Sequence, residues 1–216
     1  MEKIVIVSGG KIEDSFAAEW IEKYQPDYII AADSGMEFFY RTGKVPDMIL
    51  GDFDSVSKEI LANFKKQEGI LWKTLNPIKD DTDTEFAIRY AISLGAKQIV
   101  LLGGTGSRLD HVLGNIELLG IGLNTGVEIL LLDANNRIRM RKSGMQLKKA
   151  EQFGKYVSLI PYTNEVKHLY LKGFMYPLED ATLKGFCSLG VSNEITADVA
   201  EISFEEGILL VIESRD

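Results

Sequence analysis

Short apolar runs alternate with helical patterns along the first two thirds of the chain. The apolar runs have the length of buried strands, and the segments between them carry apolar residues at helical spacing. Strands that alternate with helices in this way predict βα units and a parallel sheet. The predicted strands are residues 3–8, 27–32, 47–50, 70–72, 98–103 and 127–133, and the predicted helices are residues 15–24, 35–42 and 57–66, with two more beginning near Asp83 and at Arg108.

After Arg141 the pattern changes to short segments that are apolar or that alternate between apolar and polar residues. Gly, Pro and Asn separate these segments, and they leave no room for a long helix. Such spacing predicts an antiparallel β domain. The segments are residues 154–161, 165–173, 193–204 and 207–214. We therefore predict two domains, residues 1–143 and residues 144–216.

The composition excludes several kinds of site and of binding partner. The chain has 216 residues, of which 45% are hydrophobic, enough for a sizeable core. Its single cysteine, Cys187, excludes an intramolecular disulfide and a thiolate zinc cluster, and two histidines leave little for a soft-metal site. A metal site would therefore be built from oxygen ligands. The net charge of −8 argues against broad binding to nucleic acids or anionic membranes, which needs a basic face.

The chain also shows no sign of export or membrane insertion. Its first apolar run, residues 4–7, is too short for the core of a secretory signal. No stretch approaches the roughly 18 apolar residues that a membrane-spanning helix needs. We expect a cytoplasmic protein.

Acidic residues gather directly after the third predicted strand. Residues 51–55 read GDFDS, which places Asp52 and Asp54 at the carboxyl end of the sheet, where open α/β sheets bind ligands. Their side chains would face the same way in an extended segment. Aspartates also commonly fill turns, so neither residue alone indicates a site.

A second acidic group, KDDTD, opens the next predicted helix and contains Asp80, Asp81 and Asp83. Thr82 and Glu85 have the spacing of a capping box, which puts Asp83 in the first helical turn. Converging carboxylates repel one another unless a cation neutralises them. Mg²⁺ binds carboxylate oxygens and keeps several water ligands, whose positions phosphate oxygens can take. The two groups together predict an enzyme that uses Mg²⁺ to move a phosphate-containing group from a nucleotide.

A glycine-rich turn, GGTGSRLDH at residues 103–111, joins a predicted strand to a predicted helix. Such a turn can bring backbone N–H groups to a phosphate, although a tight connection needs the same glycines. Arg108, His111 and Asn115 share one face of the helix. That face could simply be exposed to solvent, but its place after the glycine-rich turn favours a ligand role. A different face is predicted to be a buried stripe, formed by Leu109, Val112, Leu113, Ile116, Leu119 and Leu123. The chain contains no P-loop motif.

The β part offers one candidate binding motif, GVSNE at residues 190–194. Ser192 and Asn193 carry a hydroxyl and an amide that could read the edge of a heterocycle. The same pair is also a common turn sequence. This motif alone therefore does not indicate a binding site, and it is informative only together with other motifs.

Taken in order, six motifs resemble those of bacterial thiamine pyrophosphokinases. They are AADSG at 31–35, PDMILGDFDS at 46–55, KDDTDTE at 79–85, GTGSRLDH at 104–111, LKGFMYPL at 171–178 and VSNE at 191–194. The ordered series spans both predicted domains and is more specific than any member of it. The resemblance implies an α/β fold, in which a parallel-sheet, Rossmann-like domain precedes a small antiparallel β-sandwich.

The resemblance also implies an activity. It is the transfer of a pyrophosphoryl group from ATP, as co-substrate, to the hydroxyl of thiamine, giving thiamine diphosphate and AMP. Residues 1–143 would be the catalytic domain that binds nucleotide and Mg²⁺, and residues 144–216 the thiamine-binding domain. Family members are homodimers whose active sites lie between subunits, so a homodimer is expected.

Matching motif positions imply the site residues. Mg²⁺ would be held by Asp52, Asp54 and Asp83. Asp80 beside them and Arg108 would complete the catalytic set, and the base that receives the hydroxyl proton is expected among the aspartates.

The remaining motif positions imply two binding sets. The nucleotide and phosphate pocket would be lined by Asp33, Thr105, Arg108, Asp110 and His111. The thiamine pyrimidine would be bound by Ser192 and Asn193.

Two other hypotheses stay open at this point. DFDSV at residues 52–56 also looks like the DxDx[TV] motif of haloacid-dehalogenase-type phosphatases, with Asp52 as covalent nucleophile. Against that, the motif follows the third predicted strand rather than the first. A non-catalytic sensor of thiamine or nucleotide would keep the pocket but form no AMP.

Overall fold

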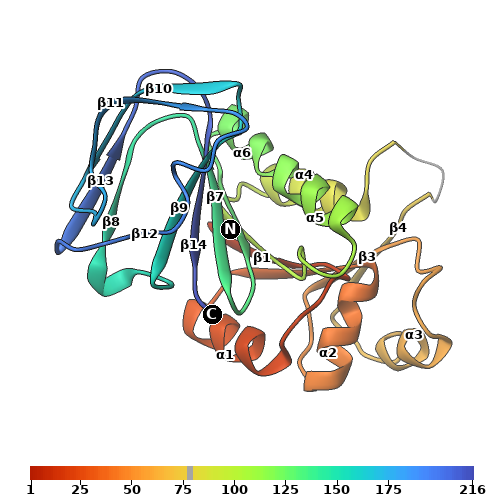
Figure 1. The fold of residues 1–216 in the computed structure, drawn as a ribbon. Helices are drawn as coiled ribbons and strands as arrows, with labels where there is room; N and C mark the ends of the chain where they lie inside the picture. The colour runs from red at the N-terminus through yellow and green to blue at the C-terminus, as the bar shows by residue number, and fades with distance from the viewer. Residues whose placement is uncertain (77–79) are drawn as a thin grey trace. The chain divides into compact units, whose positions relative to one another are not determined.

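The computed structural model describes residues 1–76 and 80–216, and the chain divides into two compact units. The first unit, Met1–Ala134, alternates strands and helices, and the second, Asn135–Asp216, consists mainly of strands. In Figure 1 the first unit runs from red to green and the second from green to blue. Lys79, the first residue of the KDDTDTE motif, lies outside the described residues.

The described part of the first unit contains one parallel sheet. Its strand order is β6-β5-β1-β2-β3-β4, and every neighbouring pair runs parallel. The strands are β1 (Lys3–Val7), β2 (Tyr28–Ala32), β3 (Met48–Gly51), β4 (Leu71–Thr74), β5 (Gln98–Leu102) and β6 (Glu128–Leu132). The predicted parallel sheet is confirmed.

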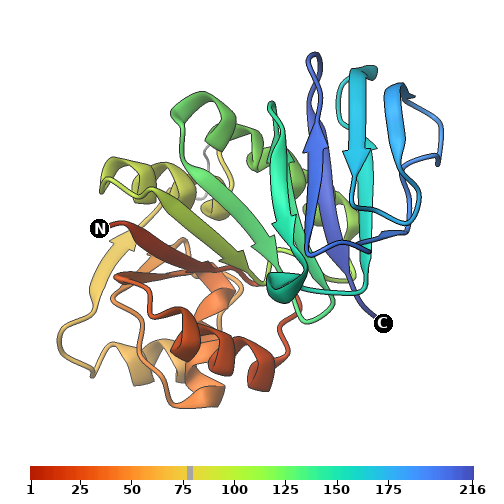
Figure 2. The ribbon, with the colours of Figure 1, turned by 90° about the vertical axis from the view of Figure 1, so that its left-hand side faces the viewer.

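Helices cover both faces of this sheet. Helices α4, α5 and α6 lie over one face, and α1 and α2 lie over the other (Figures 1 and 2). Parallel strands covered on both sides are apolar throughout, and in β1, β5 and β6 every residue after the first is buried. The helices are α1 (Asp14–Tyr24), η1 (Asp33–Gly35), α2 (Met36–Thr42), α3 (Lys58–Phe64), α4 (Asp83–Ser93), α5 (Leu109–Leu118) and α6 (Gly120–Thr125).

The sheet reverses its direction of growth at β1. Strands β2, β3 and β4 extend it on one side, and β5 and β6 extend it on the other. The loops that follow β1 and β5 lie side by side at the carboxyl edge of this reversal point, where open α/β sheets bind ligands. These loops are the SGG segment that begins at Ser8 and the glycine-rich turn that begins at Gly103.

The predicted helix starts are confirmed. Helix α4 begins at Asp83, and the hydroxyl of Thr82 accepts a 3.1 Å hydrogen bond from the backbone N–H of Glu85. Helix α5 begins at Leu109, with Arg108 at the N-cap position. The capping-box signal therefore placed the start of α4 correctly, whereas the N-cap residue of α5 makes no side-chain capping hydrogen bond.

The predicted buried stripe on the helix after Arg108 is wrong. Leu109 and Leu113 are 71% and 63% exposed, and no residue of α5 is buried. Val112 and Ile116 are half-buried, so α5 packs through a narrower face than the one predicted. Of the predicted stripe, only Leu119, between α5 and α6, is buried.

The second unit is an antiparallel β-sandwich. One layer has the strand order β12-β9-β14-β7 and the other has the order β11-β10-β13-β8. Buried side chains from both layers form one core cluster. The strands are β7 (Asn136–Arg141), β8 (Met145–Lys148), β9 (Tyr156–Pro161), β10 (Glu165–Lys172), β11 (Leu178–Lys184), β12 (Asn193–Glu194), β13 (Val199–Ser203) and β14 (Leu209–Ser214), with a short helix η2 (Lys149–Glu151) between β8 and β9.

Strands β7, β8 and β11 were not among the predicted segments. Strand β7 pairs along its whole length with β14, from Asn136 opposite Ser214 to Arg141 opposite Leu209. The second unit therefore begins at Asn135, before the boundary predicted after Ser143. The partner strand lies far along the chain, so the local pattern of NRIRMR gave no sign of the pairing.

Candidate active site

The first unit contains a cavity of about 810 Å³ at the carboxyl edge of its sheet. The loops after β1, β2, β3 and β5 line it, together with the first turns of α4 and α5. These loops converge because the strands are parallel, so their carboxyl ends share one edge. The cavity is where the predicted acidic groups and the glycine-rich turn meet.

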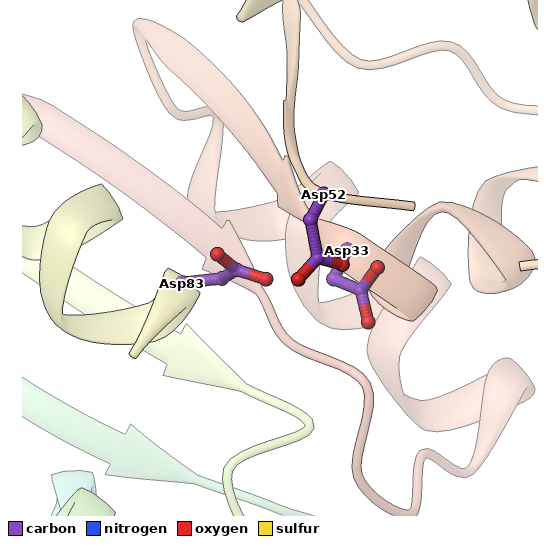
Figure 3. A group of neighbouring side chains, drawn as sticks. All are labelled: Asp33, Asp52 and Asp83. Carbon is purple, nitrogen blue, oxygen red and sulfur yellow. The ribbon is translucent and has the colours of Figure 1, made fainter. Parts of the chain in front are cut away.

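Three carboxylates converge on this cavity, from Asp33, Asp52 and Asp83 (Figure 3). One carboxylate oxygen from each lies within 4.8 Å of those of the other two, and all three residues are half-buried. Each comes from a different element: the start of η1, the loop after β3 and the first turn of α4. Asp33, which the resemblance assigned to the nucleotide pocket, therefore lies with two of the predicted metal ligands.

The backbone around Asp33 is unusual. Asp33 has a φ of 47°, in the left-handed region, and its carboxylate Oδ2 accepts a 2.6 Å hydrogen bond from the hydroxyl of Ser55. The other oxygen, Oδ1, is buried and has no hydrogen-bond partner among the described residues. Gly51 approaches closely, since a Cβ added there would lie 3.0 Å from the Cα of Asp33. Gly51 itself has a φ of 151°.

Replacing Gly51 with alanine is expected to displace Asp33 and to lower turnover about 10²-fold, because small misplacements of reacting groups have effects of this size. The matched control is Gly95→Ala, which has a φ of 84° but open space around the added Cβ. That variant is expected to lose about 1 kcal/mol of stability through backbone strain and to keep its turnover. Steady-state kinetics and thermal unfolding separate the two effects. Normal turnover in Gly51→Ala would contradict the close-approach argument.

Asp54 lines the same cavity but is exposed and lies outside the three-carboxylate group. Its backbone N–H donates a 3.2 Å hydrogen bond to Oδ1 of Asp52, which closes the loop after β3. The negative charge of Asp52 raises the pKa of the Asp54 carboxyl, with smaller contributions from desolvation, a hydrogen bond to Asp52 and the charge of Asp33. The raised pKa of Asp54 therefore results from the negative charges of the neighbouring carboxylates.

The other aspartates of KDDTD lie differently. Asp80 is exposed and Asp81 is half-buried, and in the described part of the chain neither lines the cavity. Asp83 does, because α4 begins there. A 2.8 Å hydrogen bond between the hydroxyls of Ser8 and Thr84 joins the loop after β1 to this first turn.

The donor set fits a hard divalent cation. Three carboxylates within 4.8 Å of one another repel when ionised, and the buried Oδ1 of Asp33 lacks a partner among the described residues. An unpaired buried acceptor costs about 1–3 kcal/mol, and more when it is charged. A cation with oxygen ligands, such as Mg²⁺, would relieve both costs.

Two glycine-containing loops form another wall of the cavity. The N–H of Gly10 donates to the carbonyl of Gly103 at 2.8 Å, and the N–H of Lys11 donates to that of Thr105 at 2.7 Å. A Cβ on Gly10 would lie 2.3 Å from the carbonyl oxygen of Thr105, so only glycine permits this approach. The amide of Asn115 donates to the carbonyl of Gly104 at 2.8 Å and ties α5 to the turn.

The start of α5 brings a guanidinium and an imidazole to the cavity. Arg108 and His111 line it, whereas Asp110, within the described residues, does not. Arg108 and Asp110 form an exposed ion pair of 2.7 Å. The hydrogen bond from Arg108 is the main cause that lowers the pKa of Asp110 to about 2, and the same pair raises the pKa of Arg108. Arg108 stays charged beside a helix N-terminus, as an anion-binding site requires.

Ser192 and Asn193 lie in the second unit. Asn193 is buried, and its Oδ1 accepts hydrogen bonds from the N–H groups of Tyr176 (3.0 Å) and Glu194 (2.9 Å). Its Nδ2 donates to the carbonyl of Tyr176 at 2.8 Å. Asn193 therefore holds the segment before β11 in place through the backbone of Tyr176. Its neighbour Ser192 is exposed and has a φ of 61°.

Ser8, Gly51 and Ser55 are not among the residues that the sequence predicts for the site. Each acts through a contact with a residue from a distant element, so no local pattern could identify it. Among the described helices, each is too short or too polar to span a bilayer.

Comparison with known proteins agrees across both units. The family model of the thiamin pyrophosphokinase catalytic domain matches residues 21–131, and that of the thiamin pyrophosphokinase vitamin B1 binding domain matches residues 144–209. A thiamine pyrophosphokinase from Bacillus subtilis is 34% identical over 187 residues, 87% of each chain.

Solved structures agree with these matches. The crystal structure of thiamine pyrophosphokinase from Bacillus subtilis has a TM-score of 0.89 at 32% identity, with both chains fully covered. That of the Geobacillus thermodenitrificans thiamin pyrophosphokinase has a TM-score of 0.86 at 31% identity, covering 99% of this chain and 98% of the other. The similarity therefore extends through both units in sequence and in fold.

Proposed function

Because the chain belongs to the thiamin pyrophosphokinase family, we propose that its first unit transfers a pyrophosphoryl group from ATP to the hydroxyl of thiamine, giving thiamine diphosphate and AMP. The resemblance noted from the sequence is confirmed, and the enzyme is an ATP-dependent diphosphotransferase. One observation supports the assignment to the cavity most strongly. Three carboxylates converge there opposite glycine-containing loops and a helix N-terminus.

Neither alternative hypothesis gains support. Both family models describe a thiamin pyrophosphokinase, and so do the Bacillus and Geobacillus structures. The phosphatase motif is expected after the first strand of the chain, whereas Asp52 follows β3. A sensor would need the same groups without turnover.

We assign Mg²⁺ to Asp33, Asp52 and Asp83, each of which offers a carboxylate oxygen within 4.8 Å of those of the other two. When bound, Mg²⁺ would neutralise the phosphates and align them for in-line transfer. The metal ligands predicted from the motifs include Asp54, whereas the distances between carboxylates favour Asp33 in its place. The roles of Asp54 as a metal ligand and of Asp80 as its neighbour remain predictions. The base for the thiamine hydroxyl is proposed among the cavity aspartates, because it must lie within hydrogen-bond reach of that proton.

The nucleotide is proposed to bind along the glycine-containing loops. Thr105, Arg108 and His111 line the cavity there, and Asp110 would hold Arg108 through their ion pair. Phosphoryl transfer depends on alignment and charge neutralisation, so a fixed guanidinium and backbone N–H groups are the contributions expected of these residues.

Replacing Arg108 with alanine is expected to lower kcat/KM for ATP about 10²-fold, because a preorganised charge at the transferring group is lost. Folding stability should change by less than about 1 kcal/mol, because the ion pair with Asp110 is exposed. Arg108→Lys tests whether the planar guanidinium or the charge alone is needed. The control is Arg89→Ala, which breaks an exposed ion pair with Glu85 on α4. Equal kinetics for both alanine variants would contradict the assignment.

The second unit is proposed to bind thiamine. The match of residues 144–209 to a vitamin B1 binding domain supports this, and the predicted division after Ser143 stays a proposal for where that function begins. Exposed Ser192 is available to a ligand. The amide of Asn193 already forms hydrogen bonds with the backbone of Tyr176 and Glu194. We therefore propose that Asn193 holds the shape of the thiamine site and also binds the pyrimidine.

We also propose a homodimer in the cytoplasm. The exposed apolar side chains support a partner subunit: Leu109 and Leu113 in the first unit, and Phe186 and Leu189 in the second. ATP as co-substrate supports the location. Sedimentation of a monomer at micromolar concentration would rule the dimer out.

The activity is tested by incubating the protein with thiamine, ATP and Mg²⁺ and quantifying thiamine diphosphate and AMP. Equal amounts of both products are expected. Binding of both substrates without product would favour the sensor, and release of inorganic phosphate without thiamine would favour the phosphatase.

A further inference from the structure

Ser55 touches the carboxylate group without belonging to it. It lies in the exposed loop after β3, and its hydroxyl donates a 2.6 Å hydrogen bond to Oδ2 of Asp33, 22 positions earlier in the chain. Hydrogen bonds to a carboxylate are short and strong when the acceptor is ionised. Ser55 therefore favours one orientation of the Asp33 side chain.

That orientation leaves the two oxygens of Asp33 in different states. Oδ2 is paired with Ser55, while Oδ1 is buried without a hydrogen-bond partner among the described residues. We infer that Ser55 is a positioning residue, which holds Asp33 so that Oδ1 is kept for the divalent cation. This inference rests on the proposed function in one respect, the presence of a cation at Asp33, Asp52 and Asp83.

The backbone explains why Asp33 needs such support. Its left-handed φ of 47° is a costly conformation for a residue with a side chain, and Gly51 packs directly against it. The hydrogen bond from Ser55 comes from the same segment, since Gly51 ends β3 and Ser55 follows four residues later. One loop thus fixes both the backbone and the side chain of Asp33. Partners that orient a metal ligand in this way typically change metal affinity about 10- to 100-fold when removed.

The test uses Ser55→Ala and Mn²⁺ as a spectroscopic probe, because Mn²⁺ accepts the same oxygen ligands as Mg²⁺. Electron paramagnetic resonance of the full chain without nucleotide gives the Kd for Mn²⁺. The Kd is expected to rise about 10- to 100-fold. In the kinetic assay the apparent KM for Mg²⁺ should rise by the same factor, while kcat recovers at saturating Mg²⁺. A purely structural role would not produce that split.

Two further variants control for folding. Ser55→Thr keeps the hydroxyl and should restore Mn²⁺ affinity. Ser57→Ala removes a hydroxyl from the same loop that caps α3 but does not contact Asp33, so it should cost stability and leave the Kd unchanged.

The outcomes separate the inference from the activity. Wild-type Mn²⁺ affinity in Ser55→Ala, or no Mn²⁺ binding by the wild-type protein, would overturn the positioning role. A wild-type protein that binds Mn²⁺ but forms no AMP would refute the proposed function, and a weakened Kd in Ser55→Ala would then still support Ser55.

Discussion

Replacing Asp52 with asparagine is expected to lower turnover about 10²- to 10³-fold, the range seen when one preorganised electrostatic group is removed from an active site. Asp52 supplies one of the three converging carboxylates. The asparagine Oδ1 can still accept the hydrogen bond from the N–H of Asp54, so the loop after β3 should keep its shape. Folding stability should stay the same or rise slightly, because one repelling charge is lost.

Turnover of the Asp52→Asn variant is measured at saturating Mg²⁺, ATP and thiamine, beside its thermal unfolding. The control is Asp198→Asn, the same chemical change at an exposed position in the second unit. Asp198→Asn should match the wild-type protein in both measurements. An Asp52→Asn variant with wild-type turnover would contradict the metal assignment.

Replacing Glu213 with glutamine is expected to lower the free energy of unfolding by about 3 kcal/mol, the lower end of the range for breaking a buried ion pair. The Glu213 side chain is fully buried on β14. It accepts hydrogen bonds from Arg137 at 2.6 and 2.7 Å, from Arg139, and from the N–H of Phe153 at 3.1 Å. The arginine side chains are only 21% and 12% exposed, so glutamine would leave their charges uncompensated.

The same cluster predicts a pH dependence of stability. Burial acts to raise the pKa of Glu213, but the hydrogen bonds and charges of Arg137 and Arg139 outweigh it, so the pKa lies below its ordinary value of 4.5. A carboxyl with a lowered folded-state pKa adds stability above its unfolded-state pKa and loses it as pH falls through the folded-state pKa. The wild-type protein should therefore lose stability below about pH 4.5, and Glu213→Gln should flatten that loss.

Urea unfolding at neutral and acidic pH measures both effects. The control is Glu206→Gln, which breaks an exposed ion pair with Lys167 and should cost less than about 1 kcal/mol. Equal losses in Glu213→Gln and Glu206→Gln would show that burial does not strengthen the Glu213 cluster.

The sequence predicted those parts of the fold that local signals determine. The strands of the parallel sheet appear as apolar runs, and the start of α4 follows from Thr82 and Glu85. Strand β7 alternates arginines with buried Ile138 and Met140, a short local strand signal that the prediction missed, and its pairing with β14 is non-local. The exposure of Leu109 and Leu113 escaped because helical spacing shows which residues share a face of α5, not how much of that face another element covers.

The candidate site shows the same limit. The motifs led to Asp52 and Asp83, which the structure places on one cavity. The position of Asp33 among them depends on the pairing of β2 beside β3 and on the close approach of Gly51, both long-range features. Its hydrogen bond with Ser55 likewise joins separate segments, so a single sequence contains no local sign of it.

The most direct test of the account is to follow the β-phosphate of ATP. With ATP labelled at the β-phosphorus, thiamine and Mg²⁺, pyrophosphoryl transfer predicts that the label moves into thiamine diphosphate and that unlabelled AMP is released. Label that stays in ADP, or that appears only as inorganic phosphate or pyrophosphate without thiamine diphosphate, would contradict the proposed function.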